Sequence, residues 1–398
     1  MTGAITVPLG FKAAGVAAGI KANGNADLML LAADKACAAA GVFTKNLTVA
    51  APVVVSREHV AGGRARAILV NSGCANAATG EGGLADAREM ARLAGDALGC
   101  PANEVLVAST GVIGVRLPMD KLRAGIPQAA KALARENGAA AARAIMTTDK
   151  YPKESLTEMA FGGGASAPKR TAFSVGAMGK GAGMIAPNMA TMLGFITTDA
   201  VVEPDVLARA LREAVGLTFN RITVDGDTST NDMVIALASG ASGAKASYDL
   251  LVPALTKVCR EIALMIVRDG EGAIRIAEVR VQGAASDGDA DRIARTVAES
   301  PLVKTALNGA DANWGRILAA VGRAGVALDI NRVDVHLGDA WVAEHGAART
   351  YDEAIASKAM HEDPVRIVID LHAGRGSGFM WTCDLGHGYV DVNGSYRS

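Results

Sequence analysis

Residues 180–200 read KGAGMIAPNMATMLGFITTDA, with Thr191 in the middle of the stretch. A glycine-rich approach and Pro187 come before Thr191, and an apolar run follows it. This layout is expected where a chain cleaves its own backbone ahead of a hydroxyl residue, here between Ala190 and Thr191. The cut would free the α-amine of Thr191, and an amine with an ordinary pKa near ~8 can serve as base for the adjacent hydroxyl. Thr191 is therefore a candidate nucleophile that carries its own base.

The same stretch also fits an ordinary buried strand. Met192, Leu193, Phe195 and Ile196 are apolar, and residues 181–188 would form the loop before them. Threonine often begins a strand, so composition alone favours this interpretation over self-cleavage. The choice between the two depends on the rest of the chain.

The composition limits the class of protein. With 398 residues, 50% of them hydrophobic, the chain can form two or three domains or one large layered unit. Lys and Arg number 40 against 41 Asp and Glu, a balance that gives no support for nucleic-acid binding. We see no secretory signal, and no apolar run approaches ~20 residues. We therefore expect a cytoplasmic protein without a membrane span.

The five cysteines are widely spaced, with no CxxC pair and no histidine at zinc spacing. They are typical of buried thiols in a reducing compartment, and we expect no metal site. Cys74, within NSGCAN at 71–76, is an alternative nucleophile, although no histidine lies near it in the sequence.

Periodicity predicts a mixture of strands and helices without strict β-α-β alternation, which indicates layered α/β structure with partly antiparallel sheets. Composition turns to Gly, Ala, Ser and Asp at 283–291, which suggests a boundary that opens a further α/β unit. The predicted strands lie at 29–33, 49–55, 67–70, 104–110, 172–178, 191–200, 221–225, 333–336, 341–343 and 365–371. The predicted helices lie at 84–98, 119–137, 203–215 and 247–267.

The segment 109–114, STGVIG, offers an oxyanion hole. A strand that ends at a glycine turn can point backbone N–H groups into a pocket, because glycine adopts the dihedral angles that this requires. Loss of one such donor typically raises the barrier of acyl transfer by ~3 to 4 kcal/mol. The alternative is a plain turn at the end of a strand.

Two other stretches suggest phosphate or metal chemistry and fail on inspection. DGDTSTND at 225–232 resembles the Asp-x-Asp motif of phosphoaspartyl phosphatases, but more than 200 residues precede it, whereas that motif usually opens its domain. As a calcium loop it has Thr230 in place of glycine and Ala236 in place of glutamate. GAMGKGAG at 176–183 has Ser174 and Gly181 where a phosphate loop needs glycine and a hydroxyl residue.

Taken together, three stretches resemble the ornithine acetyltransferases of arginine biosynthesis, also called glutamate N-acetyltransferases. They are KGAGMIAPNMATML at 180–193, DGDTSTND with Phe219 and Asn220 ahead of it, and the tail DLGHGYVDVNGSYRS at 384–398. The resemblance runs in collinear order from about residue 5 to residue 398. It implies self-cleavage into an alpha chain, 1–190, and a beta chain, 191–398.

The resemblance also assigns roles to residues. It implies an oxyanion hole at Thr110 and Gly111. It implies a substrate contact at Thr147 or Thr148, of which we prefer Thr148. From the residues alone, these hydroxyls and the carboxylate that follows them could instead cap a turn. The remaining implied substrate contacts are Lys180 for a carboxylate, Glu271 for an α-ammonium group, Thr191, Asn393 and Ser398. The family often ends in threonine, and Ser398 keeps the hydroxyl. The tail is apolar and aromatic for its length, so we expect it to dock.

The expected fold is then α/β, a layered α-β-β-α type sandwich with partly antiparallel sheets, plus a smaller C-terminal α/β domain. The implied activity moves acetyl from N-acetylornithine to glutamate through acetyl-threonine, without a cofactor, in a heterotetramer of two alpha and two beta chains. Use of acetyl-CoA as a second donor stays open. The alternative function is a self-cleaving aminopeptidase or amidohydrolase of related architecture, which would use water in place of glutamate.

Overall fold

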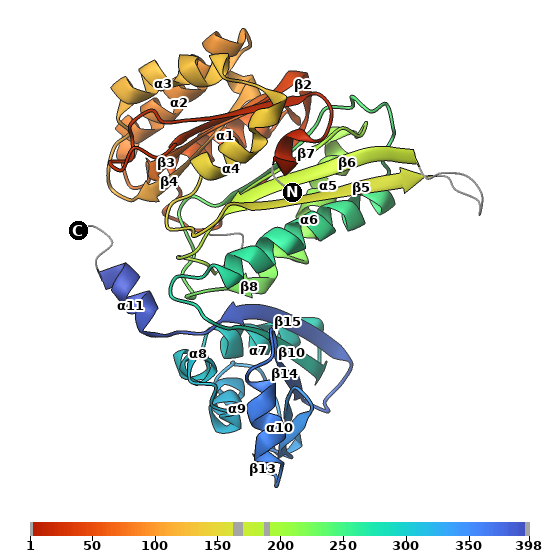
Figure 1. The fold of residues 1–398 in the computed structure, drawn as a ribbon. Helices are drawn as coiled ribbons and strands as arrows, with labels where there is room; N and C mark the ends of the chain where they lie inside the picture. The colour runs from red at the N-terminus through yellow and green to blue at the C-terminus, as the bar shows by residue number, and fades with distance from the viewer. Residues whose placement is uncertain (1–2, 162–169, 187–191, 395–398) are drawn as a thin grey trace. The chain divides into compact units, whose positions relative to one another are not determined.

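The computed structural model describes residues 3–161, 170–186 and 192–394 (Figure 1). The chain divides into two compact units. The large unit comprises residues 1–181, 185–220 and 227–266, and the small unit comprises 182–184, 221–226 and 267–398. The chain therefore enters the small unit twice, briefly, before its last third completes it.

The large unit is built on one sheet. Among its described residues, eight strands pair in the order β4-β3-β2-β9-β7-β6-β5, with β1 added beside β2. The pairs β3/β4 and β7/β9 are parallel and the others antiparallel, so the sheet is partly antiparallel as predicted. The strands are β1 (Phe11–Val16), β2 (Leu28–Phe43), β3 (Arg64–Cys74), β4 (Val105–Val112), β5 (Lys153–Phe161), β6 (Arg170–Lys180), β7 (Leu193–Thr198) and β9 (Met233–Ala238).

The long strand β2 joins the two halves of this sheet. Its first part pairs with β1 and β3, its last part pairs with β9, and the register with β3 shifts between Ala32 and Cys37. Side chains from both halves share one core, in which Leu31 and Ile68 join Phe195 and Ile235. The two halves of the sheet therefore face each other across a common interior.

Helices cover the outer faces of both halves. On one side α2 (Gly80–Leu98) and α3 (Met119–Lys131) pack against β1–β4 through a second core. On the other, α5 (Pro204–Gly216) packs on β2 and β9, while Glu261 of α6 (Tyr248–Arg268) accepts a hydrogen bond from Ser155 of β5. Figure 1 shows α2 and α3 over one half and α6 along β5 and β6. The predicted α-β-β-α arrangement is confirmed.

The strand predicted at 49–55 is wrong, because this segment begins α1 (Ala51–Val60). Pro52 lies in the first turn, where its missing N–H costs no helical hydrogen bond. Val53 packs into the core between the sheet halves and Val55 into the α2–α3 core. Burial of these side chains outweighs the preference of β-branched residues for strands.

The small unit is the predicted smaller α/β domain. Among its described residues, seven strands pair in the order β13-β12-β11-β14-β10-β15-β8, and helices α7–α10 pack on them through one aliphatic core. The segment 283–291 runs from the end of β10 into α7, inside this unit. The strands are β8 (Ile222–Thr223), β10 (Ile276–Ala284), β11 (Asp334–Leu337), β12 (Ala340–Glu344), β13 (Ala347–Ala348), β14 (Val365–Asp370) and β15 (Gly376–Cys383). The helices of the small unit are α7 (Asp287–Ala298), α8 (Pro301–Asn308), α9 (Trp314–Gly322), α10 (Glu353–Ala359) and α11 (His387–Gly394). A further short helix, α4 (Gly138–Ala144), belongs to the large unit.

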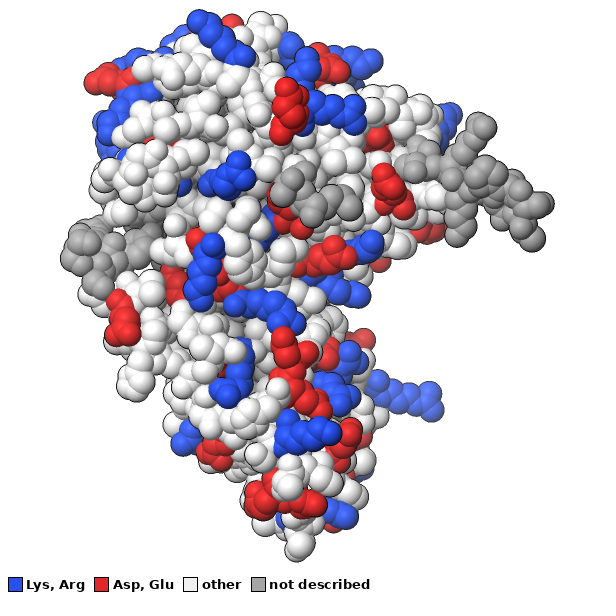
Figure 2. All heavy atoms as spheres, in the orientation of Figure 1, with Lys and Arg blue, Asp and Glu red and all other residues white. Residues whose placement is uncertain are grey.

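The described surface mixes charges of both signs. Figure 2 shows Lys and Arg side chains interspersed with Asp and Glu side chains, with uncharged surface between them. Within the described ranges, no helix combines the length and the apolar character needed to span a bilayer.

Candidate active site

The predicted site residues fall in both units, and each group is described within its own unit. The large unit holds Thr110, Gly111, Thr147, Thr148 and Lys180, while the small unit holds Glu271 and Asn393. Ala190, Thr191 and Ser398 lie outside the described residues. The predicted cleavage site and nucleophile therefore stay predictions.

The turn at Thr110 and Gly111 forms where β4 runs closely alongside β3. Gly111 has φ +134°, and a Cβ there would lie well inside contact distance of the backbone at Gly73. Gly73 also has a positive φ, and the pairing shifts just beyond it, at Cys74. Only glycine fits this approach, which fixes the position of the strand end.

A buried amide network supports the same turn. The side-chain amide of Asn231 donates to the carbonyls of Ala75, at 2.6 Å, and Ser109, at 2.9 Å. The hydroxyl of Ser109 donates to Asn71 Oδ1, and both side chains are buried. Asn231 belongs to the DGDTSTND stretch, so these bonds support a structural role for that stretch in ordering the end of β4.

Lys180, the last residue of β6, lies beside this turn. Its Nζ donates to Thr110 Oγ1 at 3.2 Å and lies 4.0 Å from Asp149 Oδ2. Lys180 is 8% exposed, so its charge sits in a poorly solvated place next to the predicted oxyanion hole. A cation in this position is suited to bind a carboxylate.

Asp149 connects Lys180 to the predicted substrate loop. Its Oδ1 accepts hydrogen bonds from Lys153 Nζ and from the N–H of Gly181, both at 2.7 Å, and its Oδ2 accepts one from the N–H of Thr147 at 2.9 Å. Burial by itself would raise the pKa of Asp149, but the charges of Lys180 and Lys153 and these hydrogen bonds lower it to about 2. Asp149 is therefore a carboxylate at neutral pH.

The structure does not choose between Thr147 and Thr148. Both residues are half-buried, and the Thr147 backbone is tied to Asp149. It does bring the Thr147–Asp149 loop, Thr110 and Lys180 into one group. We call Thr110, Asp149, Lys153 and Lys180 the large-unit cluster.

Sequence reasoning gave Asp149 only a turn-capping role and missed Lys153 and Lys21. Buried Asp27 accepts hydrogen bonds from the N–H groups of Ala18, Ile20 and Lys21, and so shapes the loop that carries Lys21. Burial lowers the pKa of Lys21, and the like charge of Lys180 lowers it further. The negative charges of Asp27 and Asp149 act in the opposite direction. Nothing in the sequence around Lys21 pointed to Lys180, because the two meet only through the fold.

In the small unit, Glu271 and Asn393 are brought together. Asn393 Nδ2 donates to Glu271 Oε2 at 2.8 Å, and the Glu271 N–H donates to the carbonyl of Ala182 at 2.9 Å. A Cβ on Gly183 would lie well inside contact distance of the Glu271 carboxylate. Glycine at 183 therefore leaves the space that this carboxylate occupies.

The described part of the C-terminal tail docks on the small unit, as predicted. Helix α11 approaches Gly272, where a Cβ would overlap the backbone of Gly388 and Tyr389. The Tyr389 hydroxyl donates to Asp225 Oδ2 at 3.3 Å, and the same oxygen accepts from the N–H of Met184. We call Asp225, Glu271, Tyr389 and Asn393 the small-unit cluster.

The alternative nucleophile, Cys74, is poorly suited to the chemistry. It is buried, its Sγ lies 3.2 Å from the carbonyl of Val115, and burial raises the pKa of its thiol. A thiol kept protonated is a weak nucleophile. Across the described residues, no three His, Cys, Asp or Glu side chains gather as ligands for a metal ion.

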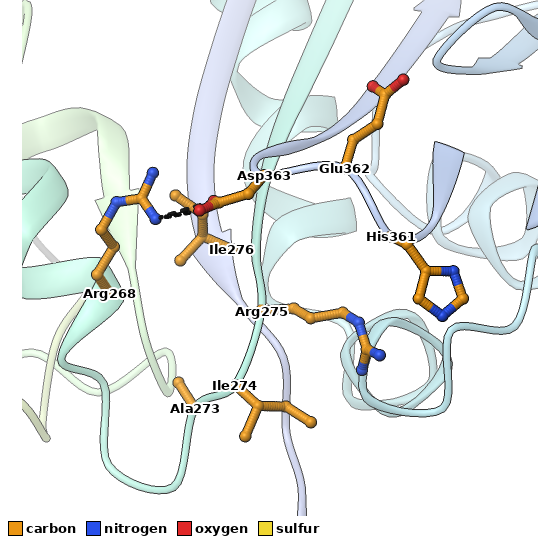
Figure 3. A pocket seen from close by; sticks show the side chains of 8 residues that line it. All are labelled: Arg268, Ala273, Ile274, Arg275, Ile276, His361, Glu362 and Asp363. Carbon is orange, nitrogen blue, oxygen red and sulfur yellow. Dashed lines mark hydrogen bonds and ion pairs between the residues drawn. The ribbon is translucent and has the colours of Figure 1, made fainter. Parts of the chain in front are cut away.

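The small unit also contains a cavity of about 460 Å³ that none of the predicted site residues lines. Figure 3 shows Arg268 paired with Asp363, at 2.6 Å, on one side and Arg275 on another. Arg275 donates to the carbonyl of Asn308 at 2.6 Å. Because no residue from the sequence motifs lines it, this cavity is a weaker candidate site than the two clusters. The lining residues are Arg268, Ala273, Ile274, Arg275, Ile276, His361, Glu362 and Asp363.

Comparison with known proteins identifies the family. The ArgJ family model matches residues 12–398. The arginine biosynthesis bifunctional protein ArgJ of Symbiobacterium thermophilum is 52% identical, over 100% of this chain and 99% of that protein, and its counterpart from Dehalococcoides mccartyi is 48% identical, over 100% and 98%. A crystal structure of the protein of this name from Bacillus halodurans is 42% identical with a TM-score of 0.50, and covers 52% of this chain and 100% of that chain. This chain therefore belongs to the ArgJ family.

Proposed function

We propose that the protein is a self-processing acetyltransferase that moves the acetyl group of N2-acetyl-L-ornithine to L-glutamate through an acetyl-threonine at Thr191. The observation that carries this proposal is the large-unit cluster, in a chain that belongs to the ArgJ family. The cluster sets a buried cation against the turn at Thr110 and Gly111. Such an arrangement suits an α-amino acid whose acyl group reacts next to its carboxylate.

The chemistry has two half-reactions. The Thr191 hydroxyl oxygen attacks the acetyl carbonyl of acetylornithine, and the α-amine of Thr191 takes the hydroxyl proton. The backbone N–H groups of Thr110 and Gly111 stabilise the oxyanion. The C–N bond then breaks, the proton passes to the leaving amine and ornithine departs. Glutamate then loses one proton from its α-ammonium group to solvent, and the neutral amine attacks acetyl-threonine. The bond to the Thr191 oxygen breaks, and this oxygen receives the second amine proton through the α-amine of Thr191, which forms N-acetylglutamate and restores Thr191.

Both substrates carry an α-carboxylate, so a contact to that group can serve both. Lys180 binds the α-carboxylate, and Glu271 binds the α-ammonium group that free glutamate carries. Thr148, with Thr147 as the alternative, contributes a hydroxyl contact, and Ser398 another. Asn393 contributes an amide and also holds the Glu271 carboxylate, at 2.8 Å. The reaction needs no metal or organic cofactor.

Cleavage between Ala190 and Thr191 activates the enzyme. One chain of the Bacillus halodurans structure matches over its whole length yet covers 52% of this chain, and residues 191–398 are themselves about half of the sequence. This agreement supports a cut near the predicted position. We also propose that the halves assemble as two alpha and two beta chains in the cytoplasm.

The halves can stay associated because they share one sheet. Strand β7 of the second half pairs with β6 of the first half on one side and with β9 on the other, and β9 also pairs with β2 of the first half. Separation of the halves would break these ladders and expose the core that Leu31 and Phe195 share.

The test is transfer with and without the acceptor. Purified protein given acetylornithine and glutamate should form ornithine and N-acetylglutamate in equal amounts, with parallel initial-velocity lines. Without glutamate, the reaction should stop after one acetyl group has been added to the 191–398 chain, as seen by mass spectrometry. Steady ornithine release without glutamate would identify the amidohydrolase instead. Glutamate with acetyl-CoA and no acetylornithine tests the second donor.

A further inference from the structure

Three segments assigned above to substrate binding or cleavage meet at one side chain that none of those assignments includes. Asp149 accepts hydrogen bonds from the N–H groups of Thr147 and Gly181, and its Oδ2 lies 4.0 Å from Lys180 Nζ. Thr147 belongs to the substrate loop, Lys180 is the proposed carboxylate partner, and Gly181 opens the glycine approach to the cleavage site. One carboxylate therefore fixes the relative positions of all three.

Asp149 also has a structural partner, and this must be separated from any role in the reaction. Its Oδ1 lies 2.7 Å from Lys153 Nζ, and both side chains are completely buried, at 0% exposure. Strand β5 begins at Lys153, so this ion pair joins the start of β5 to the preceding turn. If Asp149 only neutralised Lys153, its removal would impair folding and would leave substrate binding unaffected.

The geometry around Lys180 points to more than neutralisation. Lys180 Nζ lies 3.2 Å from Thr110 Oγ1, between the predicted oxyanion hole and Asp149. Lysine is a point charge on a flexible stem, so its position depends on what holds it. Asp149 is an acidic group placed to hold it, since the acid's own orientation is set by two backbone N–H groups and Lys153.

We propose that Asp149 is a positioning residue for acetyl transfer, which holds Lys180 and the Thr147–Thr148 loop in the arrangement that receives the α-carboxylate of both substrates. This inference rests on the proposed function. A fixed cation lowers the entropy cost of orienting the substrate, because the geometry exists before binding. Since both substrates use the same α-carboxylate, loss of Asp149 should affect both in parallel.

The decisive variant removes the buried ion pair as a whole. D149N/K153M deletes both charges and keeps the side chains close to their original size, so no unpaired charge is created at this pair. We expect this variant to fold and its KM for acetylornithine and for glutamate to rise together by about tenfold or more, with a lower kcat. Thr157→Val, also on the buried face of β5, removes one contact with Lys257 and serves as the matched control with wild-type KM values.

The outcomes separate the alternatives. A folded, cleaved D149N/K153M enzyme with wild-type KM and kcat would show that Asp149 serves only Lys153, and would overturn the inference. If the double variant does not fold, D149N alone is measured by the same criteria, and failure of both to fold would also overturn it. Wild-type protein that does not acetylate glutamate would instead overturn the proposed function, so the two failures are distinguishable.

Discussion

The large-unit and small-unit clusters hold their charges in different ways. In the large-unit cluster, Asp149 lies between two lysines, and the three side chains are at most 10% exposed. In the small-unit cluster, the Glu271 carboxylate accepts a hydrogen bond from Asn393, a neutral residue on the exposed helix α11. The first arrangement is part of the core, whereas the second depends on a docked tail. Changes to the first should therefore affect folding and chemistry together, and changes to the second should affect mainly substrate binding.

The largest effect should come from Thr191→Ala, which leaves both clusters intact. Without the hydroxyl there is no nucleophile for self-cleavage or for acetyl transfer, so we expect one uncut chain on a denaturing gel and no transfer activity. Mass spectrometry of wild-type protein should give two chains, 1–190 and 191–398. A mutant that stays uncut and still transfers acetyl would overturn the mechanism.

Asp149→Ala should destabilise the protein more than any change in the small-unit cluster. It removes the carboxylate from a fully buried ion pair with Lys153, and breaking such a pair typically costs about 3–5 kcal/mol. Urea unfolding at pH 7 measures the loss, and Asn393→Ala is the comparison from the small unit, where we expect about 1 kcal/mol or less. Equal losses for the two variants would remove the distinction between the clusters.

The contribution of Asp149 to stability should depend on pH, in a direction that follows from its pKa. The pKa of Asp149 is lowered in the folded protein, to about 2, from about 3.9 in an unfolded chain. The charged carboxylate therefore stabilises the fold above about pH 4, by about 2–3 kcal/mol, and this contribution is lost as pH falls toward 2. The stability difference between wild-type and Asp149→Ala protein should shrink over that range.

Deletion of residues 393–398 should leave cleavage and stability nearly unchanged. It removes Asn393 and Ser398, and we expect the KM of both substrates to rise by about tenfold with a smaller fall in kcat. A gel reports cleavage, and initial rates report KM. A truncated enzyme that is cut and kinetically normal would show that the tail only packs, and the roles proposed for these two residues would be withdrawn.

The smallest effect should follow Gly183→Ala, which adds one methyl group against the Glu271 carboxylate. The carboxylate can move aside, so stability should change little. The contact between Glu271 and an ammonium group should weaken, so the KM for glutamate should rise by about fivefold, or roughly 1 kcal/mol. The KM for acetylornithine should not rise in the same way, because acetylornithine has no α-ammonium group. Gly288→Ala in α7, where the added methyl meets only Ser286 Oγ at 3.8 Å, is the control. Equal increases for both substrates would contradict the role proposed for Glu271.

The two clusters also differ in how far the sequence predicted them. Thr110 and Lys180 could be proposed from strand-end and glycine patterns together with the family resemblance, and the structure places them 3.2 Å apart. Asp149 could not, because its partners Gly181 and Lys180 are about 30 residues away and meet it only through the pairing of β5 with β6. The local sequence pattern does not show how β5 and β6 are aligned.

The wrong strand prediction at 49–55 has a physical cause as well. The valines in α1 form a helix because both of its sides are buried, which a local preference for strands cannot reveal. The composition change at 283–291 marks a surface turn and the start of a helix. It could not indicate that residues 182–184 and 221–226 belong to the small unit, since that membership depends on contacts distant in sequence.

The position of β7 affects how long the cleaved protein would stay folded. The proposed cut before β7 would turn one chain into two that share a single sheet through the β6–β7 and β2–β9 ladders. The precursor can refold as one molecule, whereas the mature protein, once unfolded, would have to find its other half in solution. Its recovery after heating should then depend on protein concentration, and its working lifetime should be governed by the rate of unfolding rather than by an equilibrium. Cleavage would thereby make the enzyme active and make its unfolding harder to reverse.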